Sequence, residues 1–565
     1  MYRQEHPRPQ FEREAWKNLN GTWQFEIDRG RSGEARGLHL ADALSGTINV
    51  PFCPESKLSG VGDTDFMSSV WYRRTVTLTD AETSERVVLH FGAADYVTTV
   101  YVNGCRAGEH KGGYSSFEFD ITEFVSAGEN VITVNCVDDT RSGLIPSGKQ
   151  SDRYESYGCS YTRTTGIWQT VWLEFTPKTH IKNVKYTPSA SAGTLTVEAE
   201  LCGSGVFAVS AEFDGKPMGD ASVSSEGGFA ILTLTLAEKH LWEIGKGGLY
   251  SLSLRYGDDV VSSYFGLRDI DYRDRKFYLN GKSVFQRLVL DQGFYPDGIY
   301  TAPSDAELEA DIDRSVAMGF NGARLHEKIF EERFLYHADK KGYIVWGEYP
   351  NWGLDVSNHD AIYSVLPEWT ETVLRDRNHP SIVGWCPFNE TWDTNGRPQY
   401  NEILRLVYLA TKAMDPSRPC IDTSGNYHVV TDIYDVHNYE QDPVKFSSHY
   451  AKLAETGEHH DHCGHRQHYD GKAPFFVSEY GGIRWTKDPS GWGYGNAPTS
   501  EEEFLARLKG LTDVLLDNEA MFAYCYTQLT DVEQEQNGLY TYEREPKFPP
   551  EVIREIFGRK AAVEE

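Results

Sequence analysis

The sequence predicts a multidomain chain in which two β-sandwiches precede a (β/α)8 TIM barrel. With 565 residues the chain is too long for a single hydrophobic core. Short runs of alternating apolar and polar residues fill it up to about residue 267, and from about residue 268 such runs alternate with helix-like segments. The second pattern is typical of a parallel sheet. We therefore expect domains at 1–178, 179–267 and 268–565.

The first two domains show the pattern of sandwiches. In the first, residues alternate at 97–102 and 131–137, and Asn103-Gly104 is a strong hairpin signal. Many short strands between glycine-rich turns favour a jelly-roll sandwich. In the second, the runs 194–201 and 230–236 lie within roughly 90 residues, a length that suits an immunoglobulin-like sandwich.

The third domain carries eight short apolar runs, the number that a (β/α)8 barrel requires. Helices are expected between them: Ser304 and Glu307 form a capping-box pattern, and a further helix is expected at 501–518. The predicted strands are 285–290, 322–325, 343–346, 382–385, 419–422, 433–436, 475–477 and 522–526.

Charge and cysteine usage limit the partners of the chain. The net charge is −29, from 55 basic and 84 acidic residues, which argues against nucleic acids and anionic membranes. There is no apolar run of 18 residues, and the N-terminal segment lacks the apolar core of a signal peptide. The nine cysteines are scattered and form no CxxC pair. We therefore expect a cytoplasmic protein with reduced thiols that acts on a small substrate.

Two glutamates stand where predicted strands end. Glu390 follows the run 382–388, and Glu479 follows the run 474–478. The carboxyl ends of barrel strands meet at one mouth, so the two carboxylates are expected to converge there as an acid/base and a nucleophile. The acid needs a raised pKa, which burial beside Trp392 would provide. Considered singly, each glutamate fits a structural ion pair equally well, but two on separate strands favour catalysis.

Four motifs in the same order resemble those of glycoside hydrolase family 2, the family of β-galactosidases, β-glucuronidases and β-mannosidases. The resemblance covers nearly the whole chain and makes the first domain sugar-binding-like. The motifs are Trp71-Tyr72-Arg73-Arg74 with the segment 162–174, the segment 378–390 ending in Asn389-Glu390, Ser478-Glu479-Tyr480-Gly481, and the segment 538–547.

The resemblance implies a role for several residues. Glu390 is the acid/base, Glu479 is the nucleophile, and Asn389 binds the sugar 2-hydroxyl. Arg324 steadies the nucleophile and keeps it ionised, and Tyr439 lies beside it. Ordinary packing at the barrel rim is the alternative for Arg324 and Tyr439. No cofactor is implied.

The sequence departs from its relatives where they bind the sugar. β-Glucuronidases of the family hold the substrate carboxylate with Asn-x-Lys near the end of the barrel, whereas this chain has Glu535-Gln536-Asn537-Gly538, and Glu533 and Glu535 would repel a uronate. The usual His-x-Pro segment after strand two is also absent. Other residues are therefore expected to bind or surround the sugar, with loop packing as the alternative. They are Asp291, His326, Glu348, Trp352, Trp392, Trp485 and Tyr524.

A cluster of potential metal ligands lies in the long loop between predicted strands six and seven: His459, His460, His462, Cys463, His465 and His468. Its spacing matches no closed zinc site, so we predict a solvated loop or a lid over the sugar and no metal.

These observations predict a retaining exo-β-glycosidase, most like a β-galactosidase because a neutral sugar fits better than a uronate. A β-hexuronidase or a β-mannosidase is the alternative, and a non-catalytic carbohydrate-binding protein is the rival from another class. The expected partners are a small carbohydrate or glycoside and further copies of the chain in a homo-oligomer, without nucleic acid or membrane.

Overall fold

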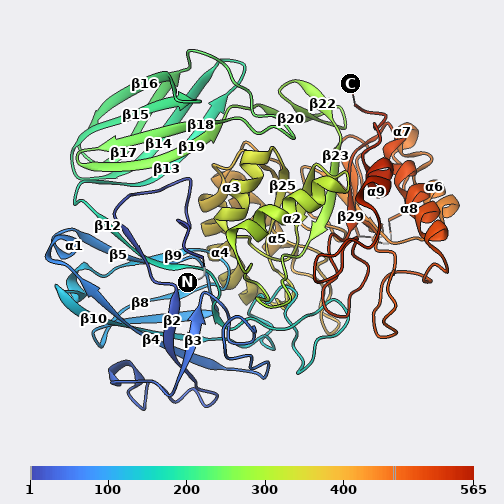
Figure 1. Cartoon of the computed structure of the whole chain (residues 1–565). Coiled ribbons are helices and arrows are strands. Elements are labelled where there is room, and N and C mark those ends of the chain that lie inside the picture. Colours follow the sequence, from blue (N-terminus) through green and yellow to red (C-terminus); the bar gives the residue numbers. More distant parts are fainter. Residues whose placement is uncertain (1–2, 462, 465, 565) are drawn as a thin grey trace.

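The computed structural model describes residues 3–461, 463–464 and 466–564 and has the predicted architecture (Figure 1). Two β-rich domains lie on one side of the molecule, the N-terminal one in blue and the second in green, and the barrel, in yellow to red, lies beside both. The prediction of two sandwiches and a barrel is confirmed.

The N-terminal sandwich has two main antiparallel sheets. Apolar side chains from both, such as Trp23, Tyr72 and Leu89, form its core. The six-stranded sheet has the order β3 (Gly46–Val50), β2 (Gly21–Ile27), β4 (Ser69–Leu78), β10 (Gly128–Val137), β7 (Val97–Val102) and β8 (Cys105–Lys111). The four-stranded sheet has the order β1 (Trp16–Asn18), β12 (Val171–Thr176), β5 (Arg86–Phe91) and β9 (Phe117–Asp120). The short strands β6 (Ala94–Asp95) and β11 (Gly166–Ile167) pair with each other, and α1 (Asp80–Ser84) precedes β5.

The second domain packs a three-stranded sheet on a four-stranded one, as in an immunoglobulin-like sandwich. In β17 every second side chain from Ala230 to Leu234 is buried and the intervening ones are exposed, because one face of the sheet covers the core. The three-stranded sheet has the order β13 (His180–Ser189), β14 (Thr194–Cys202) and β17 (Gly228–Thr235). The four-stranded sheet has the order β16 (Lys216–Ser225), β15 (Gly205–Phe213), β18 (Leu249–Tyr256) and β19 (Asp259–Gly266).

The barrel is built on a parallel sheet of seven strands. Its order is β26 (Ile382–Cys386), β25 (Ile344–Glu348), β24 (Gly322–Leu325), β23 (Gln286–Asp291), β29 (Met521–Thr527), β28 (Phe475–Gly481) and β27 (Tyr434–Asn438). Ahead of it, β20 (Ile270–Arg273), β21 (Lys276–Leu279) and β22 (Lys282–Val284) form a small meander, whose Phe277 and Leu279 join Leu288, Trp346 and Phe476 in one apolar cluster.

The predicted fifth strand, 419–422, is present only as isolated pairings. The backbone of Trp385 donates to Pro419 O at 3.0 Å and accepts from Ile421 N at 2.9 Å, and Asp432 N donates to Cys420 O at 3.0 Å. The segment thus lies between β26 and β27, the two edge strands of the sheet. Pro419 has no N–H to donate to a ladder, which keeps this pairing short.

Helices follow most of the strands and cover the outside of the barrel (Figure 1). Ser304 accepts a hydrogen bond from Glu307 N at 3.2 Å, but the Glu307 carboxylate pairs with Arg314 at 2.6 Å, so the predicted capping box is only half formed. The helix predicted at 501–518 is α8. The helices are α2 (Asp305–Ala317), α3 (Glu332–Lys341), α4 (Ile362–Asp376), α5 (Asn401–Met414), α6 (Pro443–Tyr450), α7 (Leu453–Thr456), α8 (Glu501–Leu516) and α9 (Pro550–Phe557).

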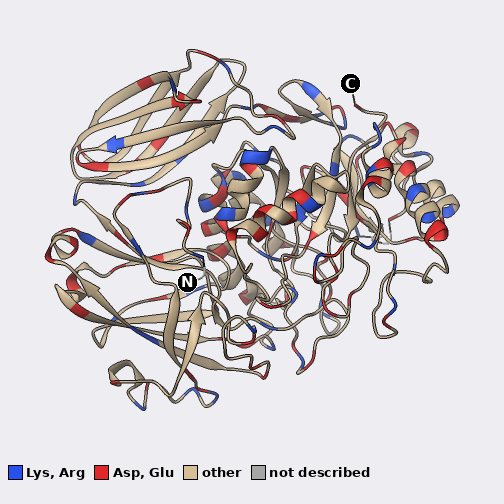
Figure 2. Ribbon diagram, in the orientation of Figure 1, with Lys and Arg blue, Asp and Glu red and all other residues tan. Residues whose placement is uncertain are grey.

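Acidic and basic residues are interspersed along the barrel helices (Figure 2). Within the described ranges, no helix is both long and apolar enough to cross a membrane. All nine cysteines are free thiols.

Candidate active site

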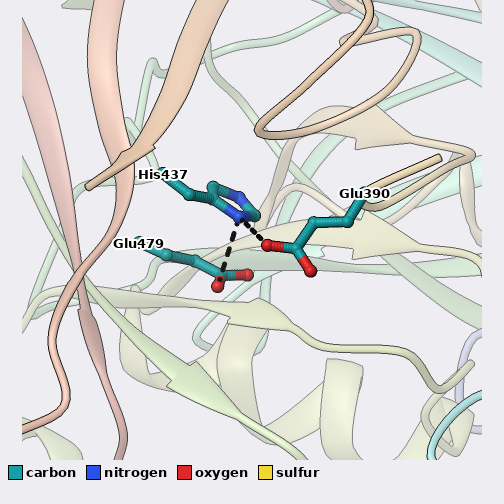
Figure 3. Close-up of side chains that lie close together, drawn as sticks. All are labelled: Glu390, His437 and Glu479. Carbon is teal, nitrogen blue, oxygen red and sulfur yellow. Dashed lines mark hydrogen bonds and ion pairs between the residues drawn. The ribbon is translucent and has the colours of Figure 1, made fainter. Parts of the chain in front are cut away.

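Glu390 and Glu479 lie at the same mouth of the barrel, as the strand-end argument predicts. Glu479 is near the end of β28. Glu390 follows β26 and has a φ of 44°, a left-handed conformation at which the chain turns away from the strand. The backbone N–H of Glu390 donates to Ser424 O at 2.9 Å, which fixes this turn. One oxygen of each carboxylate and Nδ1 of His437 all lie within 4.8 Å of one another (Figure 3).

His437, at the end of β27, lies between the two carboxylates. Its Nδ1 is 2.6 Å from Oε1 of Glu390 and 3.3 Å from Oε2 of Glu479 (Figure 3). Burial alone lowers the pKa of His437, but the two glutamates outweigh it and raise this pKa above its usual value. Burial alone raises the pKa of Glu390, but the hydrogen bond and charge of His437 hold it below its usual value. The ring therefore carries a proton toward the ionised carboxylate of Glu390.

Arg324, at the end of β24, joins the strand ends beneath the pair. Its guanidinium donates to Glu348 at 2.5 Å, to Glu479 Oε1 at 3.2 Å, to Asn389 Oδ1 at 3.1 Å and to the carbonyl of Ser478 at 2.7 Å. The planar fork thereby fixes four groups in one geometry.

Glu348 and His326 are buried in contact with each other beside Arg324. Oε2 of Glu348 is 3.0 Å from Nδ1 of His326. Burial is the largest cause that raises the pKa of Glu348, and Arg324 opposes it. Burial and the charge of Lys149 hold the pKa of His326 well below its usual value, so this imidazole is neutral.

Two tyrosines complete the wall around Glu479. The hydroxyl of Tyr439 donates to Oε2 of Glu479 at 2.6 Å. The ring of Tyr494, from the glycine-rich segment 491–495, stacks on Tyr439 with ring centres 3.5 Å apart. Both oxygens of Glu479 are therefore held by donors, Arg324 on one and Tyr439 on the other.

A loop of the N-terminal sandwich, residues 139–165, closes one side of the mouth. A cavity of about 500 Å³ lies between this loop and the barrel. Glu390 lines it, together with Tyr157 and Cys159 from the loop and Trp352 and Trp392 from the barrel. The opening beside Glu390 is thus built from two domains.

Two domain models of one known protein family match this chain. Residues 16–177 match the sugar binding domain of glycosyl hydrolases family 2, and residues 270–483 match the TIM barrel domain of the same family. The chain belongs to glycoside hydrolase family 2. The resemblance inferred from the sequence motifs is thereby confirmed.

Relatives of this family 2 protein carry two kinds of name. It is 24% identical to a β-glucuronidase of Streptococcus agalactiae over 95% of both chains. It is 27% identical to a putative β-glucuronidase of Formosa agariphila and 28% identical to a β-galactosidase of Thermoanaerobacter pseudethanolicus, matching 71% and 63% of this chain. The chain spans about half the length of these last two, 50% and 48%.

Solved structures share the fold along the entire family 2 chain. A β-glucuronidase of Lactobacillus rhamnosus superposes with a TM-score of 0.80 at 20% identity, covering 99% of this chain and 98% of its own. A β-glucuronidase of Ruminococcus gnavus in complex with D-glucuronic acid gives 0.79 at 19% identity, covering 98% and 100%. At this identity the likeness concerns the fold.

Three predicted sugar-binding residues of this family 2 protein lie away from the carboxylate pair. In β23, Leu288 and Leu290 point into the barrel, so Asp291 points outward and accepts from Gly293 N at 2.9 Å. In β29 the same alternation turns Tyr524 outward, where its hydroxyl donates to Phe557 O at 3.0 Å. Trp485 packs between Phe504 and Phe548.

The expected influence of Trp392 on Glu390 is also corrected. Trp392 lines the cavity beside Glu390 but is 50% exposed and packs edge-on against Tyr427. It does not raise the pKa of Glu390, which His437 holds below its usual value. Trp352, expected at the mouth, lines the cavity with Glu390. His437 and Lys149 were not predicted as site residues, and only His437 could have been, because it also ends a strand at this mouth.

In the part of the chain that the structure describes, the side chains that could together hold a metal ion lie at the barrel mouth and not in the histidine-rich loop. Glu390, His437 and Glu479 are the group among the described residues that could hold an ion, although an ion there would occupy both carboxylates. In the loop, His459 packs edge-on against Tyr434, Tyr469 and Phe475, and His460 stacks on His449. His462 and His465 lie outside the described residues.

Proposed function

We propose that this protein is a retaining exo-β-glycosidase that releases a terminal β-linked hexuronic acid from small glycosides. The observation that carries the proposal is the pair Glu390 and Glu479, with carboxylate oxygens within 4.8 Å. This spacing suits retention, for which the carboxyl groups lie ~5–5.5 Å apart, and leaves no room for the water of an inverting enzyme at ~6.5–9.5 Å.

In the proposed reaction, an oxygen of Glu479 forms a bond to the anomeric carbon while Glu390 donates a proton to the departing glycosidic oxygen. Glu390, now ionised, takes a proton from water, and the water oxygen displaces Glu479 and releases the sugar with its β configuration. Arg324 and Tyr439 hold the two oxygens of Glu479 in place for attack. Asn389, oriented by Arg324, is the proposed partner of the sugar 2-hydroxyl.

The proton that Glu390 donates comes from His437 in this proposal. Ser424 donates its hydroxyl to Asp435 at 2.6 Å, so its oxygen accepts from Nε2 of His437 at 3.1 Å. Nδ1 then carries the second, acidic proton, 2.6 Å from Oε1 of Glu390. Moving this proton to Glu390 leaves a neutral imidazole and gives the neutral acid that the first step requires.

The relatives support a hexuronide as the sugar. The Streptococcus agalactiae protein that aligns over 95% of both chains is named a β-glucuronidase, and so are the solved structures with the same fold. The first choice made from the sequence, a β-galactosidase-like enzyme, is less well supported than this alternative. Glu533, which the sequence led us to expect near a uronate, is directed to the N-terminal loop, where its carboxylate accepts from Thr162 N at 3.1 Å.

A panel of nitrophenyl β-glycosides tests the proposal: glucuronide, galacturonide, glucoside, galactoside and mannoside. We expect kcat/KM for one uronide to exceed that for its neutral counterpart by about 100-fold or more, since a buried charge pair is worth several kcal/mol. Proton NMR should show the β anomer as the first product, Glu479→Gln should abolish turnover, and EDTA should leave it unchanged. A neutral galactoside as best substrate, or an α anomer formed first, would contradict the proposal.

A further inference from the structure

Lys149 reaches the barrel mouth from the N-terminal sandwich. Its loop is fixed to the barrel just before this residue: Ser147 N donates to Trp352 O at 2.7 Å, and Gly148 N donates to Pro350 O at 3.1 Å. Within the loop, Tyr161 N donates to Lys149 O at 2.7 Å. These backbone bonds hold the side chain in one place without using its charge.

The Lys149 ammonium is buried and has no anionic partner among the described residues. The residue is 5% exposed, and its Nζ lies 3.5 Å from the centre of the Trp352 ring. The ammonium makes no hydrogen bond and no ion pair with any residue that the structure describes. Burial alone lowers its pKa, but Cys159 first, and then the nearby glutamates, outweigh this effect and raise the pKa, so the lysine stays charged.

Two acids outside the candidate catalytic pair, Glu327 and Glu535, act on Lys149 but have other hydrogen-bond partners. Burial raises the pKa of Glu327 well above its usual value, and one of its oxygens has no hydrogen-bond partner among the described residues. Burial also raises the pKa of Glu535, whose oxygens accept from the hydroxyl of Tyr161 and, at 3.1 Å, from Nδ2 of Asn537. Both act on Lys149 through their charge and without a hydrogen bond to its ammonium, so the ammonium has no hydrogen-bonded carboxylate among the described residues.

Lys149 lies beside the candidate catalytic residues, because the Trp352 ring that faces its ammonium donates Nε1–H to the backbone oxygen of Asn389 at 3.3 Å. Its charge lowers the pKa of Glu390, and the charge of Glu479 raises the pKa of Lys149. An isolated buried ammonium is costly, and a site that keeps one gains free energy when a complementary anion enters. A sugar seated between Glu390 and Glu479 would bring such an anion if its C6 is a carboxylate.

We infer that Lys149 binds the carboxylate of the hexuronide substrate, and that the N-terminal sandwich thereby supplies the cation that the segment Glu535-Gln536-Asn537 lacks. The inference rests on the proposed function, because only a uronide brings this carboxylate. It makes Lys149 the residue that distinguishes a hexuronide from the corresponding hexose.

The test compares Lys149→Met and Lys149→Arg with the wild-type protein on nitrophenyl β-glucuronide and β-glucoside, and on the galacturonide and galactoside pair. Lys149→Met should lower kcat/KM on the preferred uronide by about 100-fold or more and leave the neutral counterpart within a few-fold. Lys149→Arg, which keeps the charge, should lose far less. Lys57→Met is the matched control for net charge, since Lys57 is exposed on the same domain.

Binding of free D-glucuronate or D-galacturonate, measured by calorimetry against the neutral hexose, gives a second readout that needs no turnover. Lys149→Met should abolish the preference for the acid. Equal losses on acidic and neutral substrates would assign Lys149 to the support of Glu479 and overturn the inference. An unchanged preference would overturn it as well. A wild-type protein that turns over only neutral glycosides would instead refute the proposed function itself.

Discussion

His437 places Nδ1 2.6 Å from Oε1 of Glu390 and 3.3 Å from Oε2 of Glu479, so one proton faces both catalytic candidates. The same contacts raise the pKa of the histidine and lower that of Glu390. The proposed catalytic acid of the free protein is therefore better described as a histidine–glutamate pair than as one glutamate.

Replacing His437 should change the pH profile as well as the rate. In the wild-type protein the alkaline limb of kcat/KM should lie above the usual histidine value of 6.5, because the pKa of His437 is raised. In His437→Gln the proton must reside on Glu390, whose usual pKa is 4.5. The alkaline limb should therefore move to lower pH, even though burial raises the pKa of Glu390. The rate at pH 7 should fall about 100-fold. An alkaline limb that stays in place would show that His437 does not supply the proton.

Glu390→Gln should separate the two halves of the reaction. Without an acid, substrates with poor leaving groups should lose about 10³-fold or more in kcat, whereas dinitrophenyl glycosides, which leave unaided, should still form the glycosyl-enzyme. Azide needs no general base, so it should restore turnover and yield a β-glycosyl azide, detectable by NMR. Glu479→Gln, which lacks the nucleophile, serves as the control and should show no such rescue.

Arg324→Lys should be a severe change despite the retained charge. A single ammonium cannot reach Glu348, Glu479, Asn389 and the Ser478 carbonyl together, as the guanidinium does. We expect kcat to fall about 100-fold or more with a smaller change in KM, because the lost contacts orient groups for the transition state. Circular dichroism would check that the variant is folded. Near-normal kcat would mean that the nucleophile is held by Tyr439 alone.

The fold and the convergence of Glu390 and Glu479 could be predicted from the sequence for the same physical reason. Apolar runs that end in an acid, such as those before Glu390 and Glu479, are visible in one dimension, and parallel strands bring their ends to one mouth. His437 ends a strand at the same mouth, so the strand-end rule applies to it as well as to Tyr439 two positions later, the residue that the family resemblance indicated.

Other features could not be predicted with equal ease. Asp291 ends a strand and Tyr524 lies in one, yet both side chains point outward because their apolar neighbours point into the barrel. For Asp291 this follows from the alternation of side chains along the strand, since its neighbour Leu290 points inward. The position of Lys149 could not be predicted from the sequence, because contacts between two domains bring it to the barrel mouth. The lowered pKa of Glu390 depends on the position of His437, which no spacing in the sequence encodes.

Glu55 should make stability depend on pH. It is buried in the N-terminal sandwich with one oxygen unpartnered among the described residues, and burial raises its pKa to about 8. Because its pKa is raised on folding, the contribution of Glu55 to stability is fully present below 4.5, its pKa in the unfolded chain. This contribution is lost as the pH rises toward 8. Glu55→Gln should remove this loss, at about 1.4 kcal/mol per pH unit at most. Thermal unfolding at pH 5 and 9 should show the variant gaining relative stability at pH 9; a constant difference between the two would refute the assignment.

Gly148 controls the approach of the N-terminal loop to the mouth. Its φ is +54°, and a Cβ there would lie 2.5 Å from the carbonyl oxygen of Glu327 and 2.9 Å from Cβ of Pro350. Gly148→Ala should therefore push the loop and Lys149 away from the barrel and lower kcat/KM on the preferred substrate about 10-fold or more, since small displacements of binding groups are costly.

Gly158 provides the matched control for this variant. It lies in the same loop at a φ of +52°, and a Cβ added there would have nothing within 4 Å, so Gly158→Ala carries the backbone cost without the clash. If both variants lose activity equally, backbone strain rather than displacement of Lys149 is responsible. A loss confined to Gly148→Ala would tie the chemistry in the barrel to a loop from the other domain.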